Sequence, residues 1–133
     1  MRIMGIDYGD ARTGIAISDL TGTLVGETTV ISHWDPEEVA RQIAKLAKDR
    51  GVEKLVVGLP KNMNGTEGPR AQLCREFAAK LEALTGLPAV LWDERRTTVD
   101  AHRILSEQNV RGKKRKQVVD AVAASLILEG YLG

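Results

Sequence analysis

The segment Ile3–Asp19 reads IMGIDYGDARTGIAISD and contains two short apolar runs of the kind that form β-strands. The first run ends in a carboxylate, Asp7, and a connector with Gly9 and Asp10 leads to the second. This pattern predicts a β-hairpin. Asp7 is unusual because it ends an apolar strand instead of lying in the turn. A charge there loses much of its solvation, so we expect Asp7 to have a cation, hydrogen bonds or a shifted pKa.

The overall composition is that of a folded protein with one core. The chain of 133 residues is long enough for one hydrophobic core and too short for two, so we expect one domain over residues 1–133. No apolar run approaches the roughly 20 residues of a membrane span. The first strand leaves no room for a signal peptide, and the single cysteine, Cys74, fits a reducing compartment. We therefore expect a cytoplasmic protein that does not enter a membrane.

Positive charge is concentrated near the end of the chain, although the net charge is only +1. Residues 95–133 carry eight basic and four acidic side chains, and five of the basic ones form a cluster. That basic cluster consists of Arg111, Lys113, Lys114, Arg115 and Lys116. We predict that it lies in a loop and meets a polyanion, with a solvated basic loop as the alternative.

The rest of the chain alternates between strand and helix patterns. Further strands are predicted near 23–31, over 52–59 and over 89–92. The first helix is predicted from the Asp35-Pro36 start to Gly51, and the second follows a polar loop at residues 60–65 and ends at Gly86. Two further helices are predicted over 97–105 and from about 117 to 132. This order predicts an α/β fold, a mixed sheet with helices packed on it, whose later strands run parallel to their neighbours.

Two further expectations concern packing. Leu73, Phe77, Leu81 and Leu84 recur at helical spacing and are predicted to face the core. We interpret Trp34 as a packing residue rather than a platform for base stacking, because an aromatic content of 4% makes a stacking surface uncommon.

Three carboxylates occupy positions that a purely structural sequence tends to avoid. Asp7 ends the first strand, Glu94 follows the fifth beside Asp93, and Asp120 lies in the apolar part of the last helix. Carboxylates without a histidine or cysteine cluster favour hard cations such as Mg²⁺ or Mn²⁺. Two such ions can activate a water molecule and stabilise the leaving oxygen in phosphodiester cleavage. The residues alone also fit structural roles, with Asp7 in turn hydrogen bonds and Asp120 on a solvated face.

Four blocks of sequence carry a family resemblance: GIDYGDARTGIAISD (5–19), VVGLPKNMNGTEG (56–68), DERRTT (93–98) and DAVAASLIL (120–128). Their combination resembles the YqgF/RuvX family of Holliday junction resolvase-like proteins, which are described as nucleases of the small-subunit ribosomal RNA precursor. The resemblance implies an RNase H-like fold with a five-stranded sheet in order 3-2-1-4-5, strand 2 being antiparallel. It also implies a nuclease for 5′-end maturation of pre-16S rRNA, with Asp7, Glu94 and Asp120 as catalytic residues and ligands of two Mg²⁺ or Mn²⁺ ions.

One ligand position departs from the resolvases that the family resembles. Those proteins commonly place an acid at the end of the fourth strand, where this chain has Gly58-Leu59-Pro60. The acid has moved to Asp93-Glu94, and the extra methylene of Glu94 makes it the preferred ligand. Since side chains alternate across a strand, Asp93 is predicted to point the other way and to bond the backbone or an arginine such as Arg96.

Several residues are candidates for holding the substrate. Arg12 could bind a phosphate or pair with Asp10, and Asn62 could contact the substrate or only shape a turn. Arg95 and Arg96 offer guanidinium groups that match phosphate geometry. The basic cluster would hold the RNA backbone. The expected partner is an rRNA precursor, free or on the pre-ribosome, with the protein acting as a monomer or weak homodimer.

Three alternative functions remain open at the level of sequence. The first is a Holliday junction resolvase acting on branched DNA. The second is a nucleic-acid-binding factor without catalysis. The third is a nucleotide-binding protein of the actin and sugar-kinase type, whose phosphate hairpin also reads Asp-x-Gly. That third class binds nucleotide between two such domains, and this chain has length for only one.

Overall fold

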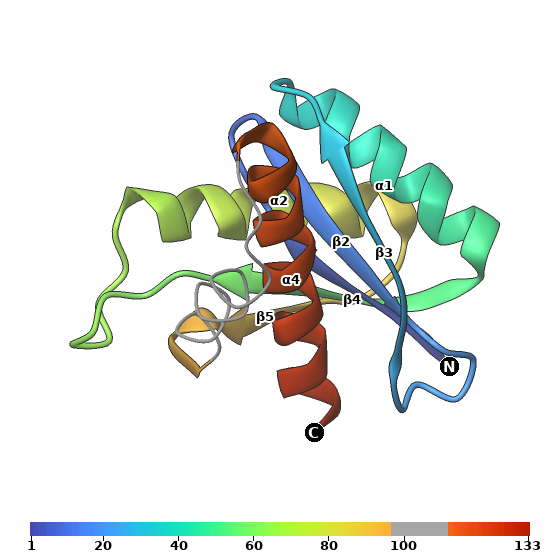
Figure 1. Cartoon of the computed structure of the whole chain (residues 1–133). Coiled ribbons are helices and arrows are strands. Elements are labelled where there is room, and N and C mark those ends of the chain that lie inside the picture. Colours follow the sequence, from blue (N-terminus) through green and yellow to red (C-terminus); the bar gives the residue numbers. More distant parts are fainter. Residues whose placement is uncertain (97–111) are drawn as a thin grey trace.

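The computed structural model describes residues 1–96 and 112–133, which form a mixed sheet with helices on both faces (Figure 1). The strands are β1 (Arg2–Asp7), β2 (Arg12–Ser18), β3 (Val25–Ser32), β4 (Val52–Leu59) and β5 (Ala89–Asp93). They are ordered β3-β2-β1-β4-β5. β2 runs antiparallel to β1 and β3, whereas β4 runs parallel to β1 and β5 parallel to β4. The predicted order and the antiparallel second strand are confirmed.

Helices α1 (Pro36–Arg50) and α2 (Pro69–Thr85) cover one face of the sheet, and α4 (Gly112–Leu132) covers the other. A 3-10 turn, η1 (Glu94–Arg96), follows β5. The start of α1 agrees with the sequence pattern, since the Asp35 carboxylate accepts a hydrogen bond from the Glu37 backbone N–H at 3.0 Å. The predicted helix over 97–105 lies outside the described residues. None of the described helices is long and apolar enough to cross a membrane.

Core clusters lie on both faces of the sheet. The largest joins β1, β2 and β4 to α1 and α2, and another joins the sheet to Ala124, Ile127 and Leu128 of α4. The backbone of α4 comes close to β2 at Gly14, where an added Cβ would lie 2.0 Å from the Asp120 carbonyl oxygen. Only glycine permits this approach, and it brings Asp120 beside the β1–β2 hairpin.

Three packing predictions were wrong. Leu73 and Leu84 are 44% and 50% exposed, because the buried stripe of α2 runs through smaller neighbours such as Ala71, Cys74 and Ala78. Trp34 is 77% exposed and does not pack in the core.

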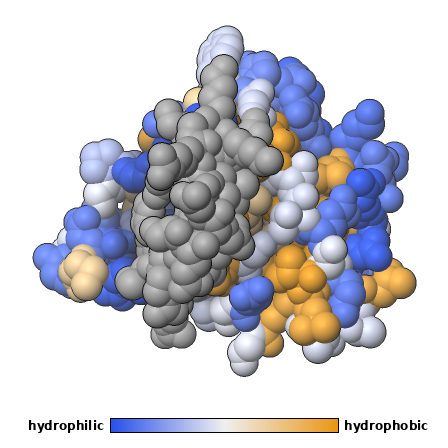
Figure 2. Space-filling model, in the orientation of Figure 1, coloured by the Kyte–Doolittle hydropathy of each residue, from blue (hydrophilic) through white to orange (hydrophobic). Residues whose placement is uncertain are grey.

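In Figure 2 the apolar colour is conspicuous near the β2–β3 connection, where Leu20 and Leu24 are 70% and 68% exposed.

The start of α4 also differs from the prediction. The helix begins at Gly112, so the backbone of residues 112–116 is helical, whereas a loop was predicted there. The run Lys113-Lys114-Arg115-Lys116 contains no proline or glycine, and lysine and arginine are good helix formers. Four members of the basic cluster therefore belong to the first turns of α4, and Arg111 lies outside the described residues.

Candidate active site

Asp7 ends β1 on the face that α4 covers. Two residues earlier, Gly5 lies against Leu128 of α4, and alternation along the strand turns Asp7 to the same side. Burial raises the pKa of Asp7, and the charge of Asp120 raises it further, while a hydrogen bond with Glu94 lowers it. We expected Asp7 to have a cation, hydrogen bonds or a shifted pKa. In the structure its pKa is raised, and it shares a hydrogen bond with Glu94.

Glu94 lies at the start of η1 and reaches back over β4. Its Oε1 lies 2.6 Å from where a Cβ on Gly58 would be. Burial raises the pKa of Glu94 to about 8, with further increases from the charge of Asp7 and the hydrogen bond that the two carboxyl groups share. At neutral pH Glu94 therefore holds a proton that Asp7 accepts in the hydrogen bond.

Asp120 comes from α4 and is bonded to Arg12 at the beginning of β2. Arg12 Nε donates to Asp120 Oδ2 at 2.9 Å, and the Asp120 side chain is 18% exposed. Burial raises the pKa of Asp120, and the Arg12 hydrogen bond and charge oppose that rise. Arg12 was predicted either to bind a phosphate or to pair with Asp10. It forms an ion pair with Asp120, and Asp10 is paired with Arg70.

Asp93 and Glu94 have different partners, although the extended backbone of β5 ends at Asp93 and Glu94 begins η1. Asp93 accepts from the Arg95 backbone N–H at 3.0 Å and from the Arg95 guanidinium, with Nη2 to Oδ2 at 2.6 Å. The Arg95 hydrogen bonds lower the pKa of Asp93 to about 2. The arginine partner is Arg95, whereas Arg96 was suggested as an example, and the Arg96 side chain lies outside the described residues.

The donor set has the chemistry of a divalent-cation site. Carboxylates from β1, η1 and α4 meet at one edge of the sheet, and oxygen donors of this kind suit Mg²⁺ or Mn²⁺. Among residues 1–96 and 112–133, no group of three or more acidic, histidine or cysteine side chains is already arranged to hold a metal ion. The Glu94 proton and the Arg12 guanidinium neutralise the carboxylates instead, and a cation would take over that role from both.

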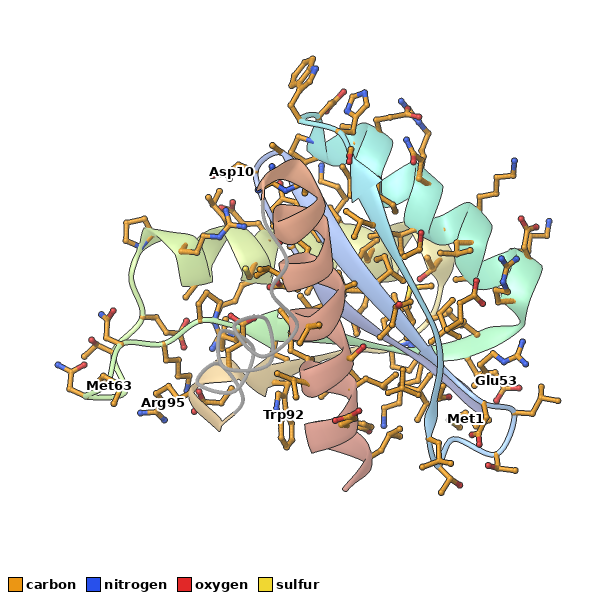
Figure 3. All side chains as sticks on the ribbon, in the orientation of Figure 1. Met1, Asp10, Glu53, Met63, Trp92 and Arg95 are labelled. Carbon is orange, nitrogen blue, oxygen red and sulfur yellow. The ribbon has the colours of Figure 1, made fainter. Side chains whose placement is uncertain are left out.

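Two predicted substrate residues have structural partners in the described part of the chain. The Asn62 side chain donates to Thr66 Oγ1 at 2.9 Å, and its backbone N–H donates to the Thr66 carbonyl at 2.8 Å. Arg95 Nη1 donates to the Met63 carbonyl at 3.4 Å, which ties this loop to the end of β5 (Figure 3). Asn62 thus shapes the turn. Arg95 holds both Asp93 and the loop.

Arg70 of α2 was missed by sequence reasoning. Its Nη1 donates to Asp10 Oδ1 at 2.7 Å, its Nη2 donates to the Tyr8 carbonyl, and its guanidinium lies over the Tyr8 ring. Arg70 therefore fastens the turn that follows Asp7, and its charge lowers the pKa values of Asp7 and Glu94. The only local signal was an arginine after Gly68-Pro69, which reads as an ordinary helix start.

Solved structures share this arrangement of strands and helices. RuvC of T. thermophilus in complex with a Holliday junction substrate has a TM-score of 0.62 at 12% identity, covering 100% of this chain and 96% of that chain. The fowlpox virus Holliday junction resolvase has a TM-score of 0.57 at 14% identity, covering 99% of this chain and 98% of that chain. The fold class is that of the RuvC-like, RNase H-type nucleases.

The chain belongs to the RuvX family. The family model, described as "Holliday junction resolvase", matches residues 1–133. A relative from Halothermothrix orenii is 50% identical over 132 residues, covering 99% of this chain and 94% of the relative. One from Bacillus cereus (strain AH187) is 48% identical over 134 residues, covering 99% and 98%. Both are named "Putative pre-16S rRNA nuclease". The family resemblance carried by the four sequence blocks is confirmed.

Proposed function

We propose that this chain is a divalent-metal-dependent nuclease that hydrolyses RNA phosphodiester bonds in the 5′-end maturation of pre-16S rRNA. The observation that carries the proposal is the meeting of Asp7, Glu94 and Asp120 at one sheet edge in a member of the RuvX family. The names of its relatives supply the substrate. We further propose that residues 1–133 act as one domain in the cytoplasm, as a monomer or weak homodimer.

The three carboxylates would hold Mg²⁺ or Mn²⁺, two ions in number. When bound, such ions lower the pKa of water and stabilise charge on a leaving oxygen. Asp7 and Glu94 would act as ligands without their shared proton, since a ligating carboxylate must be deprotonated. Arg12, once released from Asp120, is free to hold a phosphate oxygen with its guanidinium. Arg70 keeps the turn after Asp7 in place throughout.

The RNA backbone would be held by the basic residues at the start of α4. Lys116 precedes Asp120 by four residues, about 6 Å along a helix. The N-terminal end of a helix also carries a positive partial charge, which adds to that of the basic cluster. Arg95 and Arg96 lie next to Glu94 in η1 and remain proposed contacts at the other side of the carboxylates.

The proposal is tested by incubating purified protein with a pre-16S rRNA precursor in Mg²⁺ or Mn²⁺ and mapping the ends produced. The matched variant is Asp7→Asn, which preserves side-chain shape and should keep the fold while losing most cleavage, because an amide is a poorer metal ligand. Undiminished turnover by folded Asp7→Asn protein would refute the metal site. EDTA should stop cleavage by the unmodified protein.

A second candidate function is cleavage of four-way DNA junctions. It is favoured by the description of the RuvX family and by the resolvases that share the fold. A junction and the rRNA precursor, offered to the same preparation in parallel, distinguish the two activities. A factor that binds nucleic acid without catalysis would bind equally well in Mg²⁺ or EDTA and leave both substrates intact.

A further inference from the structure

Trp34 lies in the connection between β3 and α1 and is 77% exposed. Its ring stacks on the imidazole of His33, with 5.7 Å between ring centroids and 22° between planes. His33 is held in turn, because its Nδ1 accepts a hydrogen bond from the Asp35 backbone N–H at 2.9 Å. The indole is therefore supported on one side and presented to solvent.

The connection that carries Trp34 lies at the same sheet edge as the carboxylates. The His33 backbone N–H donates to the Ala11 carbonyl at 3.0 Å, which joins the end of β3 to the β1–β2 turn. Figure 1 shows these two segments side by side. Asp7 is paired with Gly14 and Gly14 with Val30, and neighbouring strands are about 5 Å apart, so Val30 lies roughly 10 Å from Asp7. Trp34 follows four residues later, about 13 Å further in an extended chain, which places it roughly 16 Å from Asp7. A strand of RNA whose phosphate lies at Asp7 would therefore reach Trp34 a few nucleotides away.

The three acidic residues that follow Trp34 within residues 35–38 are each engaged with another group. Asp35 caps α1, Glu37 is paired with Lys80, and Glu38 is paired with Arg41 at 2.6 Å. These partners reduce the repulsion that an approaching RNA backbone would meet.

We propose that Trp34 is a stacking platform for an unpaired base of the RNA substrate, a few nucleotides from the bond that is cleaved. This inference rests on the proposed function. Every base has a π face, so an exposed indole binds single-stranded RNA with little sequence preference. A protein partner fits less well, because a stable protein interface needs a contiguous surface many times larger than one ring. The exposed apolar side chains Leu20 and Leu24 lie in the β2–β3 connection, at the opposite end of the sheet.

The experiment measures binding of labelled single-stranded precursor RNA by fluorescence anisotropy in EDTA, so that cleavage does not contribute. Loss of one stacked base should weaken binding of Trp34→Ala by between about five-fold and about a hundred-fold. Trp34→Phe keeps an aromatic face and should lose less. The matched control is Leu24→Ala, which removes a side chain of similar exposure, 68%, at the far end of the sheet and should bind as the unmodified protein does.

A second readout follows the indole itself. In a Trp92→Phe background, titration with RNA should quench the fluorescence of Trp34. Unchanged RNA affinity of Trp34→Ala, or a loss equal to that of Leu24→Ala, would overturn the stacking role. If affinity is unchanged while Asp7→Asn still abolishes cleavage, only the stacking role fails. If the unmodified protein neither binds nor cleaves RNA, the proposed function fails with it.

Discussion

The Glu94 carboxylate occupies the space that a side chain on residue 58 would take, with Oε1 2.6 Å from the position of a Cβ on Gly58. An acid at the end of β5 can therefore reach the site only if the end of β4 is bare. The two residues act as a pair, since the missing side chain of one makes room for the long side chain of the other. This accounts for the glycine at position 58, near the end of β4.

The first prediction is that Gly58→Ala lowers cleavage at least ten-fold. The new methyl group would meet Glu94 Oε1 and Ile127 Cδ1, both at 2.6 Å and both at the ends of flexible side chains. We therefore expect a loss of about 1–3 kcal/mol in the free energy of unfolding, with the fold retained and Glu94 displaced. The measurements are cleavage rate and denaturant unfolding on the same preparation.

The matched control for this change is Gly26→Ala in β3, where an added Cβ would meet atoms no closer than 3.6 Å. Cleavage by that variant should stay within two-fold of the unmodified protein, about 0.4 kcal/mol in activation free energy. If Gly58→Ala cleaved as fast as Gly26→Ala, the space that Gly58 leaves for Glu94 would not be needed for cleavage.

The second prediction concerns the stability of the metal-free protein at different pH. Glu94 titrates at 4.5 when unperturbed and at about 8 in the folded chain. Between these values the folded state keeps a proton that the unfolded state has lost, so raising the pH costs stability across that window. We expect the free energy of unfolding, measured in EDTA, to fall from about pH 5 to about pH 8. The burial of Asp7 adds a contribution of the same sign.

Glu94→Gln identifies the source of this pH dependence, because the amide does not titrate. Its unfolding free energy should fall less over the same range, and Mn²⁺ should stabilise it less than it stabilises the unmodified protein. In the unmodified protein the stabilisation by Mn²⁺ should grow with pH, since binding displaces protons. Identical pH profiles for the two proteins would contradict the assignment of a raised pKa to Glu94.

The third prediction concerns the basic cluster. Replacing its five members with neutral residues should weaken RNA binding across sequences and flatten its dependence on salt. Five phosphate contacts to a single strand give a log–log slope of about −3.5, or roughly a hundred-fold in affinity between about 50 and about 200 mM salt. Anisotropy titrations at several salt concentrations measure the slope. An unchanged slope would mean that the cluster is only solvated surface.

Sequence patterns predicted the parts of the fold that local signals specify. The Asp35-Pro36 start of α1 and the hairpin around Gly9-Asp10 depend on neighbouring residues, and both are present in the structure. The basic cluster was predicted to lie in a loop, but lysine and arginine favour helices, and residues 112–116 belong to α4. In α2 the rotation of the helix about its axis decides which residues are buried. Leu73 was predicted to face the core because it is large and apolar, but the buried positions include Ala71 and Cys74 instead.

The sequence predicted the carboxylates of the candidate site but not the arginine side chains that pair with them. Asp7 and Asp120 were conspicuous as acids in apolar segments. Their cationic neighbours could not be paired, because long arginine side chains choose among several acids within reach. Arg12 bonds Asp120, 108 residues away, only because α4 approaches β2 at Gly14. Arg70 of α2 pairs with Asp10 of the hairpin because the fold brings these two segments together. Their positions in the sequence do not indicate this pairing.

The last prediction separates the neighbouring acids Asp93 and Glu94. Glu94 shares a hydrogen bond with Asp7, whereas Asp93 is held by Arg95 at 2.6 Å. Glu94→Gln should therefore abolish cleavage and leave RNA binding in EDTA nearly unchanged. Asp93→Asn should chiefly lower stability, by about 1 kcal/mol or less for a partly exposed pair, with a smaller loss of rate. If Asp93→Asn were inactive and Glu94→Gln active, the third ligand would have to be Asp93.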